Sequence, residues 1–360
     1  MASRVRAGVT RPLIGMGLVI TAMLALGWGT FFLVVLPGGY LVDGQHVFGT
    51  GLAITAFILG VRHGFDPDHI AAIDNTTRKL VGEGGRPVTV GFWFALGHST
   101  VVVVTVVLLA AGLNVLAVQL TSNDSALHQV AGVWGVLVSG VFLLLIGIIN
   151  LASLGGIWRV FRGMRSGHLD EQQLERALEA RGIMARILGP VSRRVDRPWK
   201  MYVVGVLFGL GFDTATTIAL FMVGGTMALT APWYIVLVLP ILFTAGMLIV
   251  DTLDGVVMHH AYAWAFAAPV RKVYYNLTIT TISIAVAFLV GTVGLGGLLA
   301  QAVDTRSGVL GWLAGLDIEN LGYLIVLVLI LAWAVSFAYW KLARVESRFA
   351  AQHPVPPGGE

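Results

Sequence analysis

Residues 13–36 read LIGMGLVITAMLALGWGTFFLVVL, an apolar run without a charged side chain. Similar uncharged runs follow at 129–157, 273–303 and 320–340. A bilayer core of about 30 Å is crossed by a helix of about 20 apolar residues. None of the runs alternates between polar and apolar residues, as the strands of a transmembrane barrel do. The sequence therefore predicts an all-α polytopic membrane protein.

The composition agrees with this class. Of 360 residues, 57% are hydrophobic and 12% are charged, which is about half the charged fraction of a soluble domain. The chain has no cysteine, so disulfides, thiolate metal sites, iron–sulfur clusters and thiol nucleophiles are excluded. The first apolar run is too long for the core of a signal peptide, and no small-residue cleavage site follows it. We expect a retained first helix.

Turn-forming stretches divide the chain into eight expected spans. PGG at 37–39, GEGGRP at 82–87 and APW at 231–233 mark three of the turns. The expected spans are 13–36, 48–77, 88–113, 130–155, 201–224, 232–257, 273–300 and 320–341. The expected regions are an N-terminal membrane half (1–155), a basic cytoplasmic loop (156–200), a C-terminal membrane half (201–341) and a cytoplasmic tail (342–360).

Lysine and arginine set the expected orientation, because basic loops stay on the cytoplasmic side of a membrane. With the N-terminus inside, every basic residue except Arg62 and Arg306 falls in an inner segment. These segments are 1–12, 78–87, 156–200, 258–272 and 342–360, with Lys341 at the last boundary. We expect both termini in the cytoplasm and the chain in the cytoplasmic (inner) membrane. The net charge of +4 reflects this loop bias and does not indicate a nucleic acid partner.

Two features connect the membrane halves. HLDEQQLERALEARG at 168–182 carries glutamate and arginine at helical spacing. It predicts a solvated cytoplasmic helix, with a partner-docking or regulatory helix as the alternative.

GFD occurs at 64–66 and again at 211–213, on spans of opposite direction. If spans 2–4 and 5–7 are related, they form a 3+3 inverted repeat, a transporter plan whose site lies near the midplane.

The stretch GVRHGFDPDHIAAIDNTT at 60–77 concentrates ionisable side chains within one span. An aspartate at the centre of a membrane helix costs about 2.5–3.5 kcal/mol, so these groups are expected to face the bundle interior and to pair. The ionisable residues expected inside the spans are Arg62, His63, Asp66, Asp68, His69, Asp74, His98, Asp213, Asp251 and Asp254.

Spacing brings part of this set together. His63, Asp66 and His69 follow one another at three-residue intervals and share one face of a helix. Pro67 is expected to kink or break that helix, which would also turn Asp68 inward. Two imidazoles and up to two carboxylates, without sulfur, suit nickel, cobalt, zinc or manganese. Magnesium and calcium are more often held by oxygen alone.

Structural roles are the alternatives for several of these groups. The 63–69 cluster could be a polar network held by Arg62, which is itself expected to neutralise Asp68 or Asp74. His98 is as well explained by a bond to a backbone carbonyl as by metal ligation.

For the second half of the chain, a ligand or gate role is favoured for Asp213. Asp251 and Asp254 are as well explained as solvated acids on the exit side as by ligation. His259 and His260 are expected in an inner loop. The remaining residues assigned to the pathway are Asn75, Ser99 and Thr214, and the two hydroxyls are expected to bond helix carbonyls.

The stretch RHGFDPDHIAAIDNTTRKL at 62–80 resembles the signature of the nickel/cobalt transporter (NiCoT) family, whose core is a histidine, four residues, then Asp-His. LGHSTVV at 96–102, LGFDTAT at 210–216 and GMLIVDTLDG at 246–255 resemble further motifs of that family, in its order. Two residues depart from the pattern, Pro67 for an alanine and Thr217 for a frequent glutamate.

The resemblance implies a permease that imports Ni²⁺ or Co²⁺ as its substrate, without a prosthetic group. It implies that His63, Asp68 and His69 are essential and that Asp66, His98 and Asp213 contribute.

Three functions compete at this point. The first is a secondary transporter, since no G-x-x-x-x-G-K-[ST] loop indicates a nucleotide motor and no ATPase subunit is indicated. The membrane potential or coupled protons could drive it. The second is an intramembrane metal-dependent hydrolase, although H-E-x-x-H and G-x-S-x-G are both lacking. The third is a metal sensor or a subunit of a larger complex. The preferred ion and the oligomeric state stay open.

Overall fold

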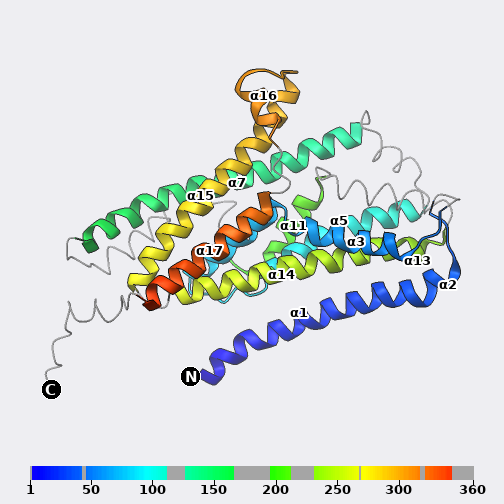
Figure 1. The fold of residues 1–360 in the computed structure, drawn as a ribbon, viewed down its shortest axis with the longest axis horizontal. Coiled ribbons are helices and arrows are strands. Elements are labelled where there is room, and N and C mark those ends of the chain that lie inside the picture. Colours follow the sequence, from blue (N-terminus) through cyan, green and yellow to red (C-terminus); the bar gives the residue numbers. More distant parts are fainter. Residues whose placement is uncertain are drawn as a thin grey trace.

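The computed structural model describes residues 2–42, 46–111, 126–165, 195–211, 231–266, 269–316 and 321–342. Apart from one bridge between Leu41 and Val47, the regular structure of these residues is helical (Figure 1). The predicted all-α class is therefore confirmed for the described part of the chain. The predicted helix at 168–182 and the tail from 343 onward lie outside it.

The helices follow the predicted order. Their bounds are α1 Ala2–Thr30, a π-helical turn Phe31–Val35, α2 Leu36–Gly38, α3 Thr50–His63, α4 Pro67–Gly82, α5 Val90–Ala110, α7 Ala126–Arg165, a 3-10 turn Pro198–Lys200, α11 Met201–Gly209, α13 Trp233–Val236, α14 Val238–Phe266, α15 Pro269–Ala302, α16 Gly308–Ala314 and α17 Leu321–Leu342.

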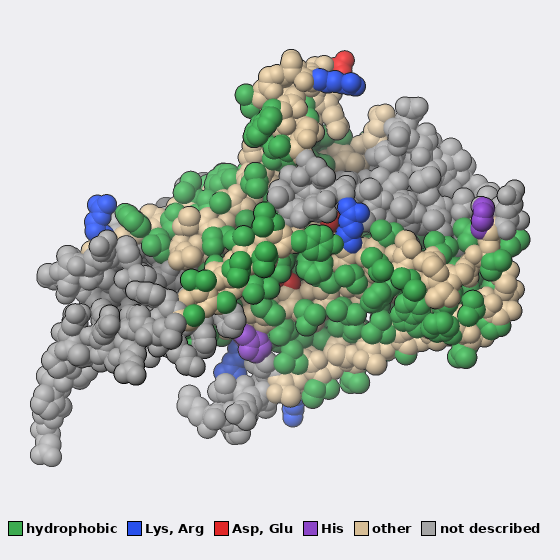
Figure 2. Space-filling view, viewed as in Figure 1, with side chains coloured by type: hydrophobic (Ala, Val, Ile, Leu, Met, Phe, Trp, Pro, Cys, Tyr) green, Lys and Arg blue, Asp and Glu red, His purple; other side chains and the backbone are tan. Residues whose placement is uncertain are grey.

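Five described helical segments are long and apolar enough to cross a membrane. They are Thr10–Gly38, Val90–Ala110, Gly132–Leu151, Trp233–Ala265 and Leu277–Ala302. Large hydrophobic side chains such as Leu33 and Leu18 are exposed on them, and apolar side chains cover much of the face in Figure 2. Lipid tails are as apolar as leucine, so such a surface suits a bilayer. The chain is a multi-pass membrane protein.

The second span is broken as the sequence predicted. Helix α3 ends at His63 and α4 begins at Pro67. Proline disfavours the helical conformation in the residue before it, and Asp66 accordingly has ψ 138°. Pro67 then occupies the first turn of α4, where its missing N–H costs nothing. The break lies between two helices that would otherwise be one span.

Two helices continue past the ends predicted for their spans. Helix α4 continues to Gly82 and α14 to Phe266, because residues 78–81 and 258–266 contain no proline or glycine that would end the helices earlier. Arg78, placed in an inner loop, is therefore helical and only 1% exposed. His259 and His260 are likewise on α14 rather than in a loop, and His259 is buried. The loop placement of these residues was wrong.

Glycines let the helices approach closely. Helix α3 packs on α14, α5 packs on both α14 and α11, and α7 packs on α15, which it crosses in Figure 1. A Cβ added at Gly60 would lie 1.9 Å from the carbonyl oxygen of Phe243, and one at Gly91 would lie 1.7 Å from that of Asp251. The positions of α3 and α5 against α14 therefore depend on these missing side chains.

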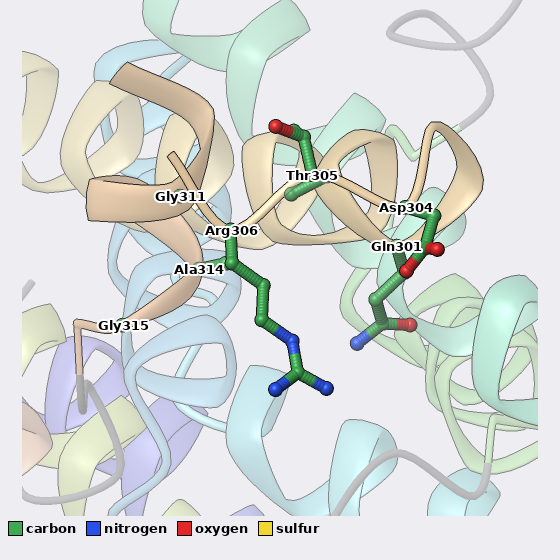
Figure 3. Close-up of a pocket in the computed structure, with 8 residues that line it drawn as sticks. Gln301, Asp304, Thr305, Arg306, Gly311, Ala314 and Gly315 are labelled. Atoms are coloured by element: carbon green, nitrogen blue, oxygen red, sulfur yellow. The ribbon is translucent and has the colours of Figure 1, made fainter. Parts of the chain in front are cut away.

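The end of α15 and the short helix α16 line an open pocket of about 490 Å³ (Figure 3). Asp304 and Arg306 line it together with Gln301. The side chains of Arg306 and Gln301 extend to the same side in the close-up. With one carboxylate and no imidazole, the lining lacks the donor set that a transition metal requires.

Candidate metal site

The break between α3 and α4 brings two histidines together. His63 is the last residue of α3 and His69 lies in the first turn of α4. Their rings are 4.7 Å apart between centroids. His98 reaches the same point from the middle of α5. One ligand atom from each histidine lies within 4.8 Å of the other two, and all three residues are at most 4% exposed.

Two imidazole nitrogens face each other directly within this group. The Nε2 atoms of His63 and His98 are 2.9 Å apart. A neutral imidazole carries one donor and one acceptor nitrogen, so the pair forms a hydrogen bond only if one Nε2 bears a proton. If both carry lone pairs, they repel unless a cation lies between them. The arrangement therefore provides a place for a cation.

A carboxylate oxygen lies next to the Nδ1 atom of two of the histidine rings. Asp251 Oδ2 is 3.3 Å from Nδ1 of His69, in hydrogen-bond geometry. Asp66 Oδ2 is 2.7 Å from Nδ1 of His63, close enough for an ion pair but outside hydrogen-bond geometry. Metal-binding histidines commonly donate their second ring N–H to a carboxylate, which orients the ring and raises its basicity. For His69, this contact leaves Nε2 as the nitrogen that could bind a metal, and Nε2 of His63 faces His98.

Aromatic side chains pack against two of the histidine rings. The ring of Phe94 is 4.8 Å from that of His69, and the ring of Phe243 is 5.5 Å from that of His63. Both phenylalanines are fully buried. An apolar wall lowers the local dielectric and strengthens every charge interaction inside it. The site therefore places three imidazoles, which could bind a metal, among buried aromatic side chains.

The other predicted residues take different positions. Asp68 is half-buried and accepts a hydrogen bond from the backbone N–H of His69 at 3.0 Å, and Arg62 is half-buried. Asp251 is 0% exposed, so the solvated-acid alternative is wrong for it. The buried Oγ of Ser99 has no hydrogen-bond partner among the described residues, contrary to the predicted bond to a helix carbonyl.

Further buried polar atoms without a partner lie on His98 and on two aspartates of α14. Among the described residues, His98 Nδ1, Asp251 Oδ1 and Asp254 Oδ2 are buried without a hydrogen-bond partner. Buried polar atoms are usually satisfied by protein, water or an ion. Asp213, Thr214 and Thr217 lie outside the described residues, so their relation to the histidines is not described.

A second buried polar group was not predicted from the sequence. Arg62 was expected to neutralise Asp68 or Asp74, and the partners described for Asp74 are the hydroxyls of Tyr262 and Ser283, from which it accepts hydrogen bonds. The arginine whose charge acts on it is Arg78. The i,i+4 spacing of Asp74 and Arg78 on one helix was a signal for this proximity. The other members of this second polar group are buried residues on three other helices: Asn150, Tyr262, Thr280 and Ser283.

Comparison with known proteins finds a matching family and several similar nickel transporters. Residues 49–339 match the family NicO, described as high-affinity nickel-transport protein. The chain is 48% identical over 332 residues to the nickel transporter NicT of Mycobacterium tuberculosis, covering 92% of this chain and 89% of the relative. It is 41% identical to the nickel transporter NixA of Staphylococcus aureus, covering 86% of this chain and 91% of the relative.

A cobalt transporter is also similar. The cobalt transport protein NhlF of Rhodococcus rhodochrous is 37% identical, and the match covers 82% of this chain and 84% of the relative. No solved structure matches the chain significantly. The chain spans most of the length of each of these three relatives.

Proposed function

Since the chain belongs to the NicO family of high-affinity nickel-transport proteins, we propose that it moves Ni²⁺ or Co²⁺ into the cytoplasm through the buried histidine group. The family is one of transporters and not of enzymes. The observation that carries the proposal is the convergence of His63, His69 and His98 at the break of a membrane helix. The membrane concerned is the cytoplasmic membrane, and the ion is the substrate.

In this proposal the three histidines are ligands, and Asp66 and Asp251 orient two of them. The distance of 2.9 Å between the Nε2 atoms of His63 and His98 bears on the preferred ion. Two nitrogens about 2.0–2.1 Å from one ion are that far apart when the angle between them is about 90°. Right angles belong to square-planar and octahedral ions such as nickel(II), whereas tetrahedral zinc requires wider ones. Asp68 and Asp213 are proposed to complete the coordination during transport.

We further propose eight spans with both termini in the cytoplasm and a 3+3 inverted repeat. Four helices carry an aromatic residue three positions before a glycine: FILG at 57–60, FALG at 94–97, YVVG at 202–205 and FTAG at 243–246. In the proposed repeat, α3 corresponds to α11 and α5 to α14. The pair α3 and α14 then corresponds to the pair α11 and α5.

The contacts of these glycines support that correspondence. In the α3–α14 pair, a Cβ on Gly60 would meet the carbonyl oxygen of Phe243, and one on Gly246 would meet that of Phe57. The α5–α11 pair has the same two contacts. There, a Cβ on Gly205 would meet Phe94 O and one on Gly97 would meet Tyr202 O, each at 2.0 Å. Inverted repeats place the substrate between two such halves and let them rock around it.

Cysteine labelling tests the orientation, because the chain contains no cysteine of its own. Glu83→Cys lies after α4 on the proposed inner side, and Asp304→Cys lies after α15 on the proposed outer side. A membrane-impermeant maleimide added to intact cells is expected to label the variant at 304 and to reach the variant at 83 only after lysis. The opposite pattern contradicts the proposed topology.

Uptake by vesicles that contain only this protein tests the function. With an inside-negative potential, radioactive nickel is expected to accumulate, because each charge gains about 2.3 kcal/mol per 100 mV. Unlabelled cobalt should compete strongly, and zinc and manganese weakly. Vesicles that bind nickel at their surface but accumulate none contradict transport. Metal-dependent cleavage of lipid or peptide without accumulation favours the hydrolase alternative.

A further inference from the structure

Helix α4 carries a second buried polar cluster on the side opposite the histidine group. His69 and Arg78 are nine residues apart, which at 3.6 residues per turn places them on opposite sides of the helix. Asp74 and Asn75 lie between them in sequence, and all four residues are at most 5% exposed. Burying a carboxylate and a guanidinium in a membrane helix is costly, so we expect these two groups to have a function separate from the histidine site.

Neutral partners hold both charges of this cluster. Asp74 accepts one hydrogen bond from the hydroxyl of Tyr262 and another, of 2.8 Å, from that of Ser283. Arg78 donates through Nη1 to Thr280 Oγ1 at 2.6 Å and through Nη2 to Asn75 Oδ1 at 3.0 Å. These contacts connect α4 to α14 and α15. The charge of Arg78 acts on Asp74 from a neighbouring position on the same helix.

Hydroxyl partners allow a carboxyl group to exist in either protonation state. A hydroxyl donates to a carboxylate, and it can rotate to accept from a protonated carboxyl group. A lysine or arginine bonded directly to Asp74 would permit only the ionised state. A cavity of about 10 Å³ adjoins the group, lined by Asp74, Asn75 and Ser283 with apolar residues of α4, α15 and α17. This is close to the smallest space that holds one water molecule.

Among the described residues, few groups face Asp74. Helix α4 contributes Arg78, and α14 contributes Tyr262 and Asp254. The charge of Asp254 interacts with that of Asp74. Helix α15 contributes the neutral Ser283. The residues of α17 at the cavity, Ile325 and Leu329, are apolar. Beyond Asn75, α7 contributes the neutral Asn150, which donates to Asn75 Oδ1 at 2.6 Å.

We propose that Asp74 binds a proton that the transporter exchanges for the imported metal ion. The proposal rests on the transport function proposed above. Asp74 lies five residues after His69, a displacement of about 7–8 Å along the helix. A dication among the histidines favours the ionised carboxylate, so metal binding and proton binding oppose each other. Linkage makes this opposition reciprocal: a proton on Asp74 weakens metal binding and favours metal release.

Because metal and proton bind in alternation, the two ions move in opposite directions. One metal ion with two positive charges enters, and one proton leaves Asp74 for the outside. Each cycle moves one net positive charge inward, so the membrane potential still drives uptake. Protons from the cytoplasm reload Asp74 after release of the metal. Uptake should therefore become faster as the interior pH falls.

Reconstituted vesicles with a trapped pH dye and a clamped membrane potential test the proposal. Addition of nickel to wild-type vesicles is expected to make the interior more alkaline in proportion to nickel uptake. In Asp74→Asn, the remaining nickel uptake should proceed without alkalinisation and without dependence on interior pH. Asp304→Asn is the matched control, because it makes the same change at an exposed residue whose φ of 47° asparagine accepts. It should behave as the wild type.

A second variant keeps the test valid if Asp74→Asn does not fold. Tyr262→Phe removes one donor to the ionised carboxylate and should shift the interior-pH profile of uptake to higher pH. An unchanged profile overturns the proposal, and so does nickel-linked alkalinisation that persists in Asp74→Asn. Wild-type uptake without any proton movement also overturns it while leaving the transport function intact. Absence of nickel uptake in the wild type contradicts the transport function itself.

Discussion

Replacing His63 with alanine is expected to lower nickel uptake by more than about 100-fold, since loss of an outer partner of a ligand alone costs ~10–100-fold. His63 is in contact with both other histidines, and its Nε2 faces that of His98. Without it, two imidazoles remain and no pair of nitrogens at 2.9 Å. The measurement is radioactive nickel uptake by reconstituted vesicles at equal protein content.

His260→Ala is the matched control for this experiment. His260 lies on α14, is exposed, and its Nδ1 bonds the carbonyl oxygen of Val256 one turn earlier. Its loss should leave uptake within about twofold of wild type, since exposed substitutions rarely have large effects. Normal uptake by the His63 variant excludes the histidine group as the transport site.

The same assay separates a ligand from an orienting residue. Asp251→Asn keeps the shape of the side chain that faces Nδ1 of His69 but removes its charge. The apparent affinity for nickel should fall by about 10-fold, with transport retained at high nickel concentration. A loss as complete as that of the His63 variant would instead make Asp251 a ligand.

Replacing Gly91 with alanine is expected to destabilise the protein by about 3 kcal/mol, at the upper end of the usual cost of overpacking. The added Cβ would lie 1.7 Å from the carbonyl oxygen of Asp251 and 2.5 Å from its carbonyl carbon. Both atoms belong to the backbone, so α5 and α14 must separate. His98 on α5 and Asp251 on α14 would then move apart, and uptake should be lost as well.

The matched control is Gly51→Ala in α3, where nothing lies within 4 Å of an added Cβ. There alanine should be neutral or stabilise the helix by about 0.5–1 kcal/mol. Thermal unfolding in detergent, followed by size-exclusion chromatography, measures both variants. Equal melting temperatures for the two variants contradict the close approach of α5 to α14.

Much of the fold was predictable because it follows from local rules. Uncharged runs of sufficient length predicted the spans, and the described spans are helical. Pro67 predicted the break, because a proline disfavours helix in the residue before it whatever surrounds it. The ends of α4 and α14 were placed too early, at Thr77 and Val257. There charged and polar residues suggested a loop, but tertiary packing buries Arg78 and His259.

The candidate site was predictable only in part. Spacing on one helix placed His63 and Asp66 together, and the structure retains that contact across the break. No local pattern placed His98 opposite His63, or Asp251 behind His69, because these contacts join helices far apart in sequence. The four aromatic-x-x-glycine stretches were a visible signal for the helix pairs, but their reciprocal contacts exist only once the helices are packed.

From its residues alone, this chain is predicted to cross a membrane, to have an interrupted second span, and to resemble nickel and cobalt transporters. Those conclusions depend on apolar length, on proline and on short motifs, all of which act within a few residues. The packing of the helices in three dimensions was needed to show which nitrogens meet, which carboxylates lie next to them, and that Asp74 belongs to a separate cluster. A buried polar atom takes its partner from whichever helix packs beside it, and glycine contacts between distant segments set that packing.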